Sequence, residues 1–289
     1  MSVGAPRATN CAMKLLLLTA LTMVAFAANS VLNRAGVAGQ GMDPLAFGVI
    51  RLASGAAALA AIVLWQRRGF ALGGVGRGVA VVALLAYIFG FSVAYRGLDA
   101  GLGALLLFGV VQVTMFGGAL FAREEIPTTR WVGAAVALAG LIMLLWPSGS
   151  VRVPVGAALA MGIAGLGWGV YSLQGRRESD ATQATAMNFI LAAPLALMVW
   201  LAQGAGGEFA VAGVALAVVS GVITSGLGYA LWYAILPNLG AARAGVAQLS
   251  VPVIAMAGGM IFLAEPVTWR FVGSASLVIA GVLISMRRV

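Results

Sequence analysis

The chain consists of long apolar runs separated by short polar segments, and the runs do not alternate between polar and apolar positions. A helical run of about 20 apolar residues spans one bilayer. In lipid every backbone polar group must find an internal partner, so spanning segments are helices or closed barrels, and runs without alternation favour helices. The pattern predicts ten spans, at residues 15–33, 45–65, 79–96, 100–121, 131–146, 155–174, 185–202, 211–235, 241–263 and 271–286.

Composition supports lipid as the main solvent of this chain. Of the 289 residues, 62% are hydrophobic and only 9% are charged, and the mean hydropathy is +1.04. A soluble domain carries about 25% charged residues. The net charge of +9 is typical of basic loops that anchor a membrane protein, and we expect no nucleic-acid partner.

The positions of Lys and Arg predict the orientation. With a cytoplasmic N-terminus, twelve basic residues fall inside and four fall outside, and Arg51 lies within a span. Both termini are therefore expected in the cytoplasm of a bacterial-type inner membrane. The first run, with Lys14 and the stretch Ala25-Phe26-Ala27, also resembles a cleavable signal peptide. That run continues through Leu32, however, and an internal repeat requires its helix.

The repeat is marked by two similar loops that are separated by about half the length of the chain. AREEIPTTRWVG at 122–133 matches AEPVTWRFVG at 264–273, so that Glu125 and Glu265 are 140 positions apart. The halves are 1–147 and 148–289, with five spans each. Because five is odd, the second half enters the membrane from the opposite side, which is a recurring plan of secondary transporters. The predicted fold is an all-α membrane protein of ten transmembrane helices, arranged as two inverted five-helix repeats around a central cavity.

These motifs carry a family resemblance. DPLAFGVIRLASGAAAL at 43–59, together with the paired Glu-Pro loops, resembles the drug/metabolite transporter superfamily and its ten-helix EamA-type exporters. YRGLDAGLGALL at 95–106, followed by a span with Gln112, is most similar to the YddG amino-acid exporters. The resemblance implies spans five and ten at the periphery of a helical basket. It also implies export of small metabolites, namely aromatic and other neutral amino acids.

Polar and aromatic side chains within spans are costly in lipid, so they face a cavity or another helix. Here they concentrate on spans one, three, four, six, eight and nine, whereas spans five and ten hold very few. Rings on one helical face could stack on a substrate ring and attract its ammonium group. Helix packing or an interfacial aromatic belt is the alternative, above all for Tyr95 and Tyr233. The predicted substrate-binding residues are Asn29, Tyr87, Phe91, Tyr95, Gln112, Met115, Trp168, Tyr171, Ser225, Tyr229 and Gln248.

Arg51, Pro252, two loop glutamates and several glycines allow separate predictions. Arg51, inside the second span, either snorkels to the headgroups or caps a helix, or it binds a substrate carboxylate. Pro252 in span nine is expected to act as a hinge. Glu125 and Glu265 are expected to tie their loops to helix ends or to arginines. Glycine pairs and the run Gly165-x-Gly167-x-Gly169 should let helices approach closely.

The acidic residues bear on energy coupling. All eight fall in loops or at span edges, and the chain has no His and one Cys. We therefore expect no catalytic residue, metal site or cofactor, and transport without proton coupling by a monomer. A proton-coupled exporter that uses Asp43, Asp99 or Glu265, and that carries another solute or a drug, is the alternative. A channel, or a structural or enzymatic membrane protein, is the alternative outside this class.

Overall fold

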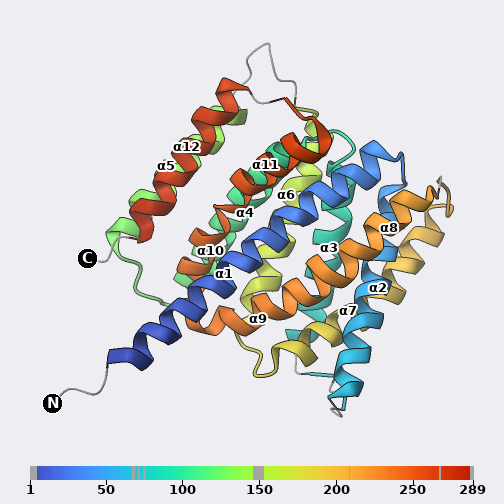
Figure 1. Cartoon of the computed structure of the whole chain (residues 1–289), viewed down its shortest axis with the longest axis horizontal. Helices are drawn as coiled ribbons and strands as arrows, with labels where there is room; N and C mark the ends of the chain where they lie inside the picture. Colours follow the sequence, from blue (N-terminus) through green and yellow to red (C-terminus); the bar gives the residue numbers. More distant parts are fainter. Residues whose placement is uncertain are drawn as a thin grey trace.

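Helices make up nearly all of the chain in the computed structural model, which describes residues 5–66, 69–70, 72–73, 76–145, 153–207, 209–266 and 268–286 (Figure 1). Two π-helical segments, η1 and η2, continue or connect α-helices. The elements are α1 (Ala5–Arg34), η1 (Ala35–Gly39), α2 (Pro44–Trp65), α3 (Gly76–Ala94), α4 (Ala100–Phe121), α5 (Thr128–Leu145), α6 (Val155–Gly175), α7 (Ala181–Ala202), α8 (Val211–Val219), η2 (Ser220–Leu227), α9 (Gly228–Leu239), α10 (Ala241–Gln248), α11 (Val251–Leu263) and α12 (Trp269–Met286).

Each of the ten predicted runs is helical in the structure. Run eight comprises α8, η2 and α9, and run nine comprises α10 and α11. Eight helical segments within the described residues are long and apolar enough to cross a membrane, and α5 and α12 are not among them. The predicted boundary between the two halves, at residues 147 and 148, lies outside the described residues, as do Arg67, Arg68, Arg152, Arg287 and Arg288.

Several helices begin where the sequence supplies a cap. Asp43 precedes Pro44 and accepts a hydrogen bond from the amide of Ala46 at 2.9 Å. Asp180 does the same for α7, accepting from the amide of Gln183 at 3.0 Å. Short polar side chains before the first turn satisfy amides that lack an intrahelical partner. These caps fix where α2 and α7 start.

Glycines bring α3, α4 and α6 into close contact, as the sequence predicted. A Cβ atom at Gly167 would lie 2.6 Å from the carbonyl oxygen of Ala83 on α3. At Gly165 it would lie 2.8 Å from the carbonyl oxygen of Leu107 on α4. Any larger side chain would force these helices apart, because small residues are what permits such close backbone approach in membranes.

Helices α5 and α12 lie side by side at one edge of the molecule (Figure 1). Their contact is reciprocal. A Cβ at Gly140 of α5 would lie 2.8 Å from the carbonyl oxygen of Ser274, and a Cβ at Gly281 of α12 would overlap the carbonyl oxygen of Gly133. Gly140 and Gly281 are 141 positions apart, and so are Gly133 and Ser274. Gly140 and Gly281 thus each lie against the backbone of the other helix.

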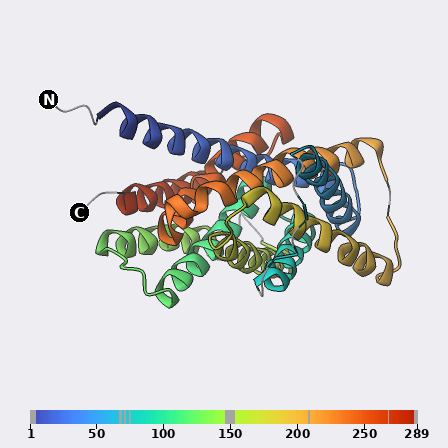
Figure 2. The same ribbon diagram turned by 90° about the horizontal axis from the view of Figure 1, so that it is seen from below.

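The start of α1 and the end of α12 lie towards the same end of the bundle (Figure 1). The first turns of α1 extend beyond the other helices (Figure 2). Apolar side chains such as Leu17, Val82 and Ile261 are exposed on the outer surface. An outer surface of this kind matches a lipid environment.

Candidate functional site

Arg51 lies at the centre of the main polar cluster. It is the eighth residue of α2, about 10 Å along the helix axis from its start, and its side chain is fully buried. Its Nε donates to the hydroxyl of Ser225 at 2.7 Å. Its Nη2 donates to the hydroxyls of Tyr87, at 3.2 Å, and of Tyr229. The guanidinium therefore does not snorkel to a membrane surface.

Of the side chains that the structure describes, aromatic rings and no acidic group surround this guanidinium. Its Cζ lies 5.2 Å from the ring centre of Phe91, 5.4 Å from that of Tyr87 and 6.0 Å from that of Tyr229. Such rings attract a cation through their negative faces. Among the residues that the structure describes, no carboxylate forms an ion pair with Arg51, and its Nη1 has no hydrogen-bond partner. A buried charge without a counter-ion is costly and commonly marks a functional site in a membrane protein.

The backbone of span eight is shaped to meet Arg51. Gly55 of α2 and Gly221 of η2 cross at a distance that excludes a Cβ on either residue. The widened π-helical turns of η2 run from Ser220 to Leu227 and include Ser225. Such turns within α-helices are rare and are frequent at functional sites. The close crossing and the π-helix together place the Ser225 hydroxyl against Arg51.

Asn29 of α1 ties the same π-helix to the centre. Its Oδ1 accepts from the hydroxyls of Ser220, at 2.8 Å, and of Thr224. Its Nδ2 donates to the carbonyl oxygen of Thr224 at 3.1 Å and to the Tyr229 hydroxyl at 3.4 Å. A network whose members are all paired rigidifies its surroundings. Asn29 therefore fixes the positions of η2 and Tyr229 relative to Arg51.

An aromatic cluster extends from Tyr229 towards α10. The ring centres of Trp168 and Tyr229 are 4.6 Å apart, and those of Trp168 and Tyr87 are 4.9 Å apart. The indole of Trp168 donates to Oε1 of Gln248 at 2.5 Å. Gln248 is the last residue of α10, and α11 starts only at Val251, just before Pro252. The predicted hinge proline thus follows a real break in the helix and lies in the first turn of α11, where its missing amide would have no intrahelical partner.

A second buried arginine, Arg77, belongs to a different kind of cluster. Its Nη1 donates to Oδ1 of Asn188 at 2.8 Å and to the carbonyl oxygen of Ala184 at 3.0 Å. Its Nη2 forms an ion pair with Glu178 at 3.1 Å. Asn188 in turn donates to the hydroxyls of Tyr171 and Tyr233. Arg77 was expected in a loop, but it is buried on α3 and joins α3 to α7.

At the opposite end of α3, Glu265 closes the bundle. Both of its carboxylate oxygens accept from the amide of Ala100, at 2.9 and 3.0 Å, at the start of α4. Arg34 pairs with Glu265 at 3.5 Å and with Asp99 at 3.2 Å. Burial raises the pKa of the Glu265 carboxyl, and the charge of Asp99 adds to this, against the lowering by Ala100 and Arg34.

The loop before α5 behaves differently from its repeat mate. Glu125 is exposed and, within the described part of the chain, forms no hydrogen bond or ion pair. Its neighbour Glu124 pairs instead with Arg176 at 2.6 Å. The expectation that the two loop glutamates tie their loops to helix ends or arginines is confirmed for Glu265 and is wrong for Glu125.

The structure brings most of the predicted binding residues together around Arg51. All eleven are buried. Those in the cluster are Asn29, Tyr87, Phe91, Trp168, Tyr171, Ser225, Tyr229 and Gln248. Tyr95 contacts the cluster through Phe91, whose ring centre is 4.7 Å from its own, while its hydroxyl donates to the carbonyl oxygen of Ala100 at 3.2 Å. Two lie elsewhere: Met115 packs near Gly245, and Gln112 lines a separate pocket.

Sequence reasoning did not single out Ser220 and Asn188. Both are polar residues inside apolar runs, and this is the signal that could have identified them. Their partners, Asn29 and Arg77, are 191 and 111 residues away along the chain. The pattern gave no indication of that pairing.

Comparison with known proteins agrees with this architecture. An uncharacterised protein of Pseudomonas aeruginosa is 44% identical over 269 residues, which are 92% of this chain and 92% of that protein. An uncharacterised transporter of Archaeoglobus fulgidus is 28% identical over 70% of this chain and 75% of its own length. A protein of known crystal structure, 18% identical, shares the fold over 93% of this chain and 97% of its own, with a TM-score of 0.73.

The second half of the chain carries the family signature. Residues 155–287 match the EamA-like transporter family. The apolar helices of the structure agree with an integral membrane protein. The second half of the chain is therefore similar to members of the EamA-like transporter family.

Proposed function

We propose that this chain is a secondary transporter that exports small metabolites, above all aromatic and other neutral amino acids, without coupling to protons. The observation that carries the proposal is Arg51, which is fully buried and has no acidic partner among the described residues. A substrate carboxylate would supply the missing negative charge. Guanidinium groups bind carboxylates through two parallel hydrogen bonds, and Nη1 is free to make one of them.

The aromatic side chains suit the rest of such a substrate. Tyr87, Trp168 and Tyr229 form adjoining ring faces beside Arg51. Ring faces can stack on an aromatic side chain or attract an ammonium group. An amino acid presents a carboxylate and an ammonium group together, and its net charge is zero. The arrangement therefore favours a zwitterion over a phosphorylated substrate, for which several cationic side chains would be needed.

An inverted repeat would provide the two conformations that transport needs. The reciprocal Gly140–Ser274 and Gly281–Gly133 contacts support a twofold relation between the halves. Glu265 caps α4, while its repeat mate Glu125 is unpaired. We infer that the Glu265 end is closed in this state and that Glu125 makes the matching contact when the other end closes. The broken helix at Gln248 and the π-helix η2 are the segments where such motion would concentrate.

Uptake into liposomes containing the purified protein tests the proposal. Labelled tryptophan, threonine and methionine would be supplied with and without an imposed pH gradient. We expect saturable uptake that the gradient does not change. Tryptamine, which lacks the carboxylate, should compete far less well than tryptophan, because it cannot pair with Arg51. Equal competition by the two would remove the role assigned to Arg51.

One observation favours a second candidate, a proton-coupled exporter. Burial raises the pKa of Glu265, and this carboxylate holds the closed end through Ala100 and Arg34. Because this state raises that pKa, protonation would favour the closed end over an open state in which the carboxyl has its ordinary pKa, so a pH gradient would bias the exchange between the two states. Uptake that occurs only with a pH gradient, and that Glu265→Gln abolishes, would establish this mechanism in place of the uncoupled one.

A further inference from the structure

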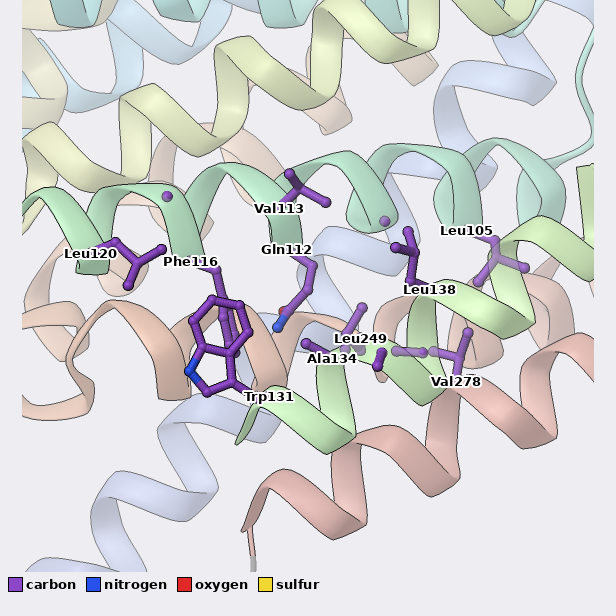
Figure 3. A pocket seen from close by; sticks show the side chains of 14 residues that line it. Leu105, Gln112, Val113, Phe116, Leu120, Trp131, Ala134, Leu138, Leu249 and Val278 are labelled. Carbon is purple, nitrogen blue, oxygen red and sulfur yellow. The ribbon is translucent and has the colours of Figure 1, made fainter. Parts of the chain in front are cut away.

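A pocket of about 390 Å³ lies between α4, α5 and α12, apart from the Arg51 cluster (Figure 3). Small-molecule sites range from roughly 300 to 1,000 Å³, so the pocket is large enough to hold a ligand. Its walls include Leu105, Phe116 and Leu138, and Leu249 contributes from the break between α10 and α11.

Gln112 is the polar feature of this pocket. It lies near the middle of α4, its side chain extends from that helix into the pocket (Figure 3), and its Oε1 lies close to Gly245 of α10. The residue is only 5% exposed, and neither its Oε1 nor its Nε2 has a hydrogen-bond partner. A buried amide without hydrogen-bond partners is costly in an apolar medium. A ligand that pairs with both atoms would remove that cost.

The mouth of the pocket opens to the bilayer. The side chains of Val113, Leu120, Trp131 and Leu138 line the pocket and are also exposed on the apolar outer surface of the molecule. A molecule that enters here would come from the lipid phase. Among the described residues that line the pocket there is no Lys, Arg, Asp or Glu, so a charged group would be unpaired at mid-membrane depth. The ligand must therefore be neutral.

We propose that this pocket binds a neutral, lipid-soluble molecule with one hydroxyl or amide group, which pairs with Gln112. Either group can donate a hydrogen bond to Oε1 and accept one from Nε2. The apolar body of the ligand lies against Phe116, Trp131 and Leu138. This site is distinct from the proposed amino-acid site and does not depend on it.

Photolabelling of the full-length protein in lipid nanodiscs tests the proposal. The probe is a twelve-carbon primary alcohol with a diazirine in its chain, and the matched control is the same chain without the hydroxyl. We expect the alcohol to label α4 and α5 in a saturable way, with competition by unlabelled dodecanol. Labelling is located by mass spectrometry of peptides and requires no transport, so its failure is separable from failure of the amino-acid proposal.

Two variants make the test specific. Gln112→Leu keeps the shape and removes the amide, so it should lower alcohol labelling about tenfold and leave alkane labelling unchanged. Gly117→Phe should block both probes, because a Cβ at Gly117 meets nothing within 4 Å and the added ring can extend into the pocket. Folding is checked by the elution volume and the thermal unfolding of each variant.

The groove between α3 and α6 provides an internal control. It is lined by apolar residues such as Val82, Ile163 and Leu166, with no amide. Alcohol and alkane should label it equally. Labelling that does not saturate, that spreads evenly over lipid-facing helices, or that Gln112→Leu leaves intact would overturn the proposal.

Discussion

Arg51 and Arg77 are both buried arginines of the first half of the chain, but their surroundings differ. Arg77 pairs with Glu178, Asn188 and a backbone carbonyl. Arg51 is held by three hydroxyls and three rings, and one of its nitrogens has no partner. The charge of Arg77 is neutralised within the protein, whereas the charge of Arg51 is not.

This difference indicates which arginine stabilises the fold and which serves function. A paired buried charge leaves an uncompensated partner behind when it is removed, and that is strongly destabilising. An unpaired buried charge adds cost to the folded state, so it persists where binding requires it. Burial alone would not have separated the two residues, since both are almost inaccessible to solvent.

The largest expected effect is that of Arg51→Leu on transport. Loss of the partner of a desolvated charge costs about 2–5 kcal/mol, and each 1.4 kcal/mol is about tenfold. Uptake of tryptophan at low concentration should therefore fall by about 30-fold or more, while the melting temperature stays unchanged or rises. Uptake by Arg51→Lys, which keeps the charge but not the paired donors, should lie between that of the wild type and that of Arg51→Leu. A folded Arg51→Leu protein with wild-type uptake would contradict the functional assignment.

Arg77→Leu should give the opposite result. It leaves Asn188 and Glu178 without their partner, at a cost of about 3 kcal/mol, towards the low end for a buried pair because Glu178 is partly exposed. Thermal unfolding in detergent should occur several degrees lower. Uptake per folded molecule should stay within about twofold of wild type, since the residue does not contact the Arg51 cluster. A drop in uptake without loss of stability would place Arg77 in the transport pathway.

Tyr229→Phe tests the difference between the Arg51 and Arg77 clusters by removing a single hydroxyl. This hydroxyl accepts from Arg51 and donates to the Tyr87 hydroxyl at 2.9 Å. Hydrogen bonds to charged groups contribute about 1.5–3 kcal/mol, so the KM for tryptophan should shift by about tenfold. The matched control is Tyr233→Phe, whose hydroxyl belongs to the Arg77 cluster. Equal KM values for the two variants would mean that the clusters are not functionally distinct.

The smallest expected effect concerns pH, which should act at Glu265 and not at Arg51. Because burial raises the pKa of Glu265, the folded chain holds this proton more tightly than the unfolded chain. Its contribution to the free energy of unfolding therefore rises as the pH falls through the raised value towards the ordinary one. As the pH is lowered from neutral towards the ordinary pKa of a Glu side chain, the melting temperature of the wild type should rise relative to that of Glu265→Gln. Parallel pH profiles would contradict the assigned shift.

The sequence predicted the helices well because a bilayer imposes one rule on every span. Apolar length and backbone satisfaction together specify a helix wherever a run of about 20 residues occurs. The same rule identified Asn29, Tyr87, Ser225 and Tyr229, since polar groups in such runs are costly. The rule also predicted Gln112, but it gave only the polarity of this residue and not its direction, and the structure places it in a separate pocket.

What the sequence by itself determined is the set of helices, their apolar surface and the spacing of the two matching loops, because these depend on local hydrophobicity and on periodicity. Tertiary structure alone decided that Arg51 meets Ser225 across 174 residues, that η2 is a π-helix, and that Arg77 is paired while Arg51 is not. These features depend on which glycines let which helices touch, and contact between distant segments is a property of packing that no single run encodes.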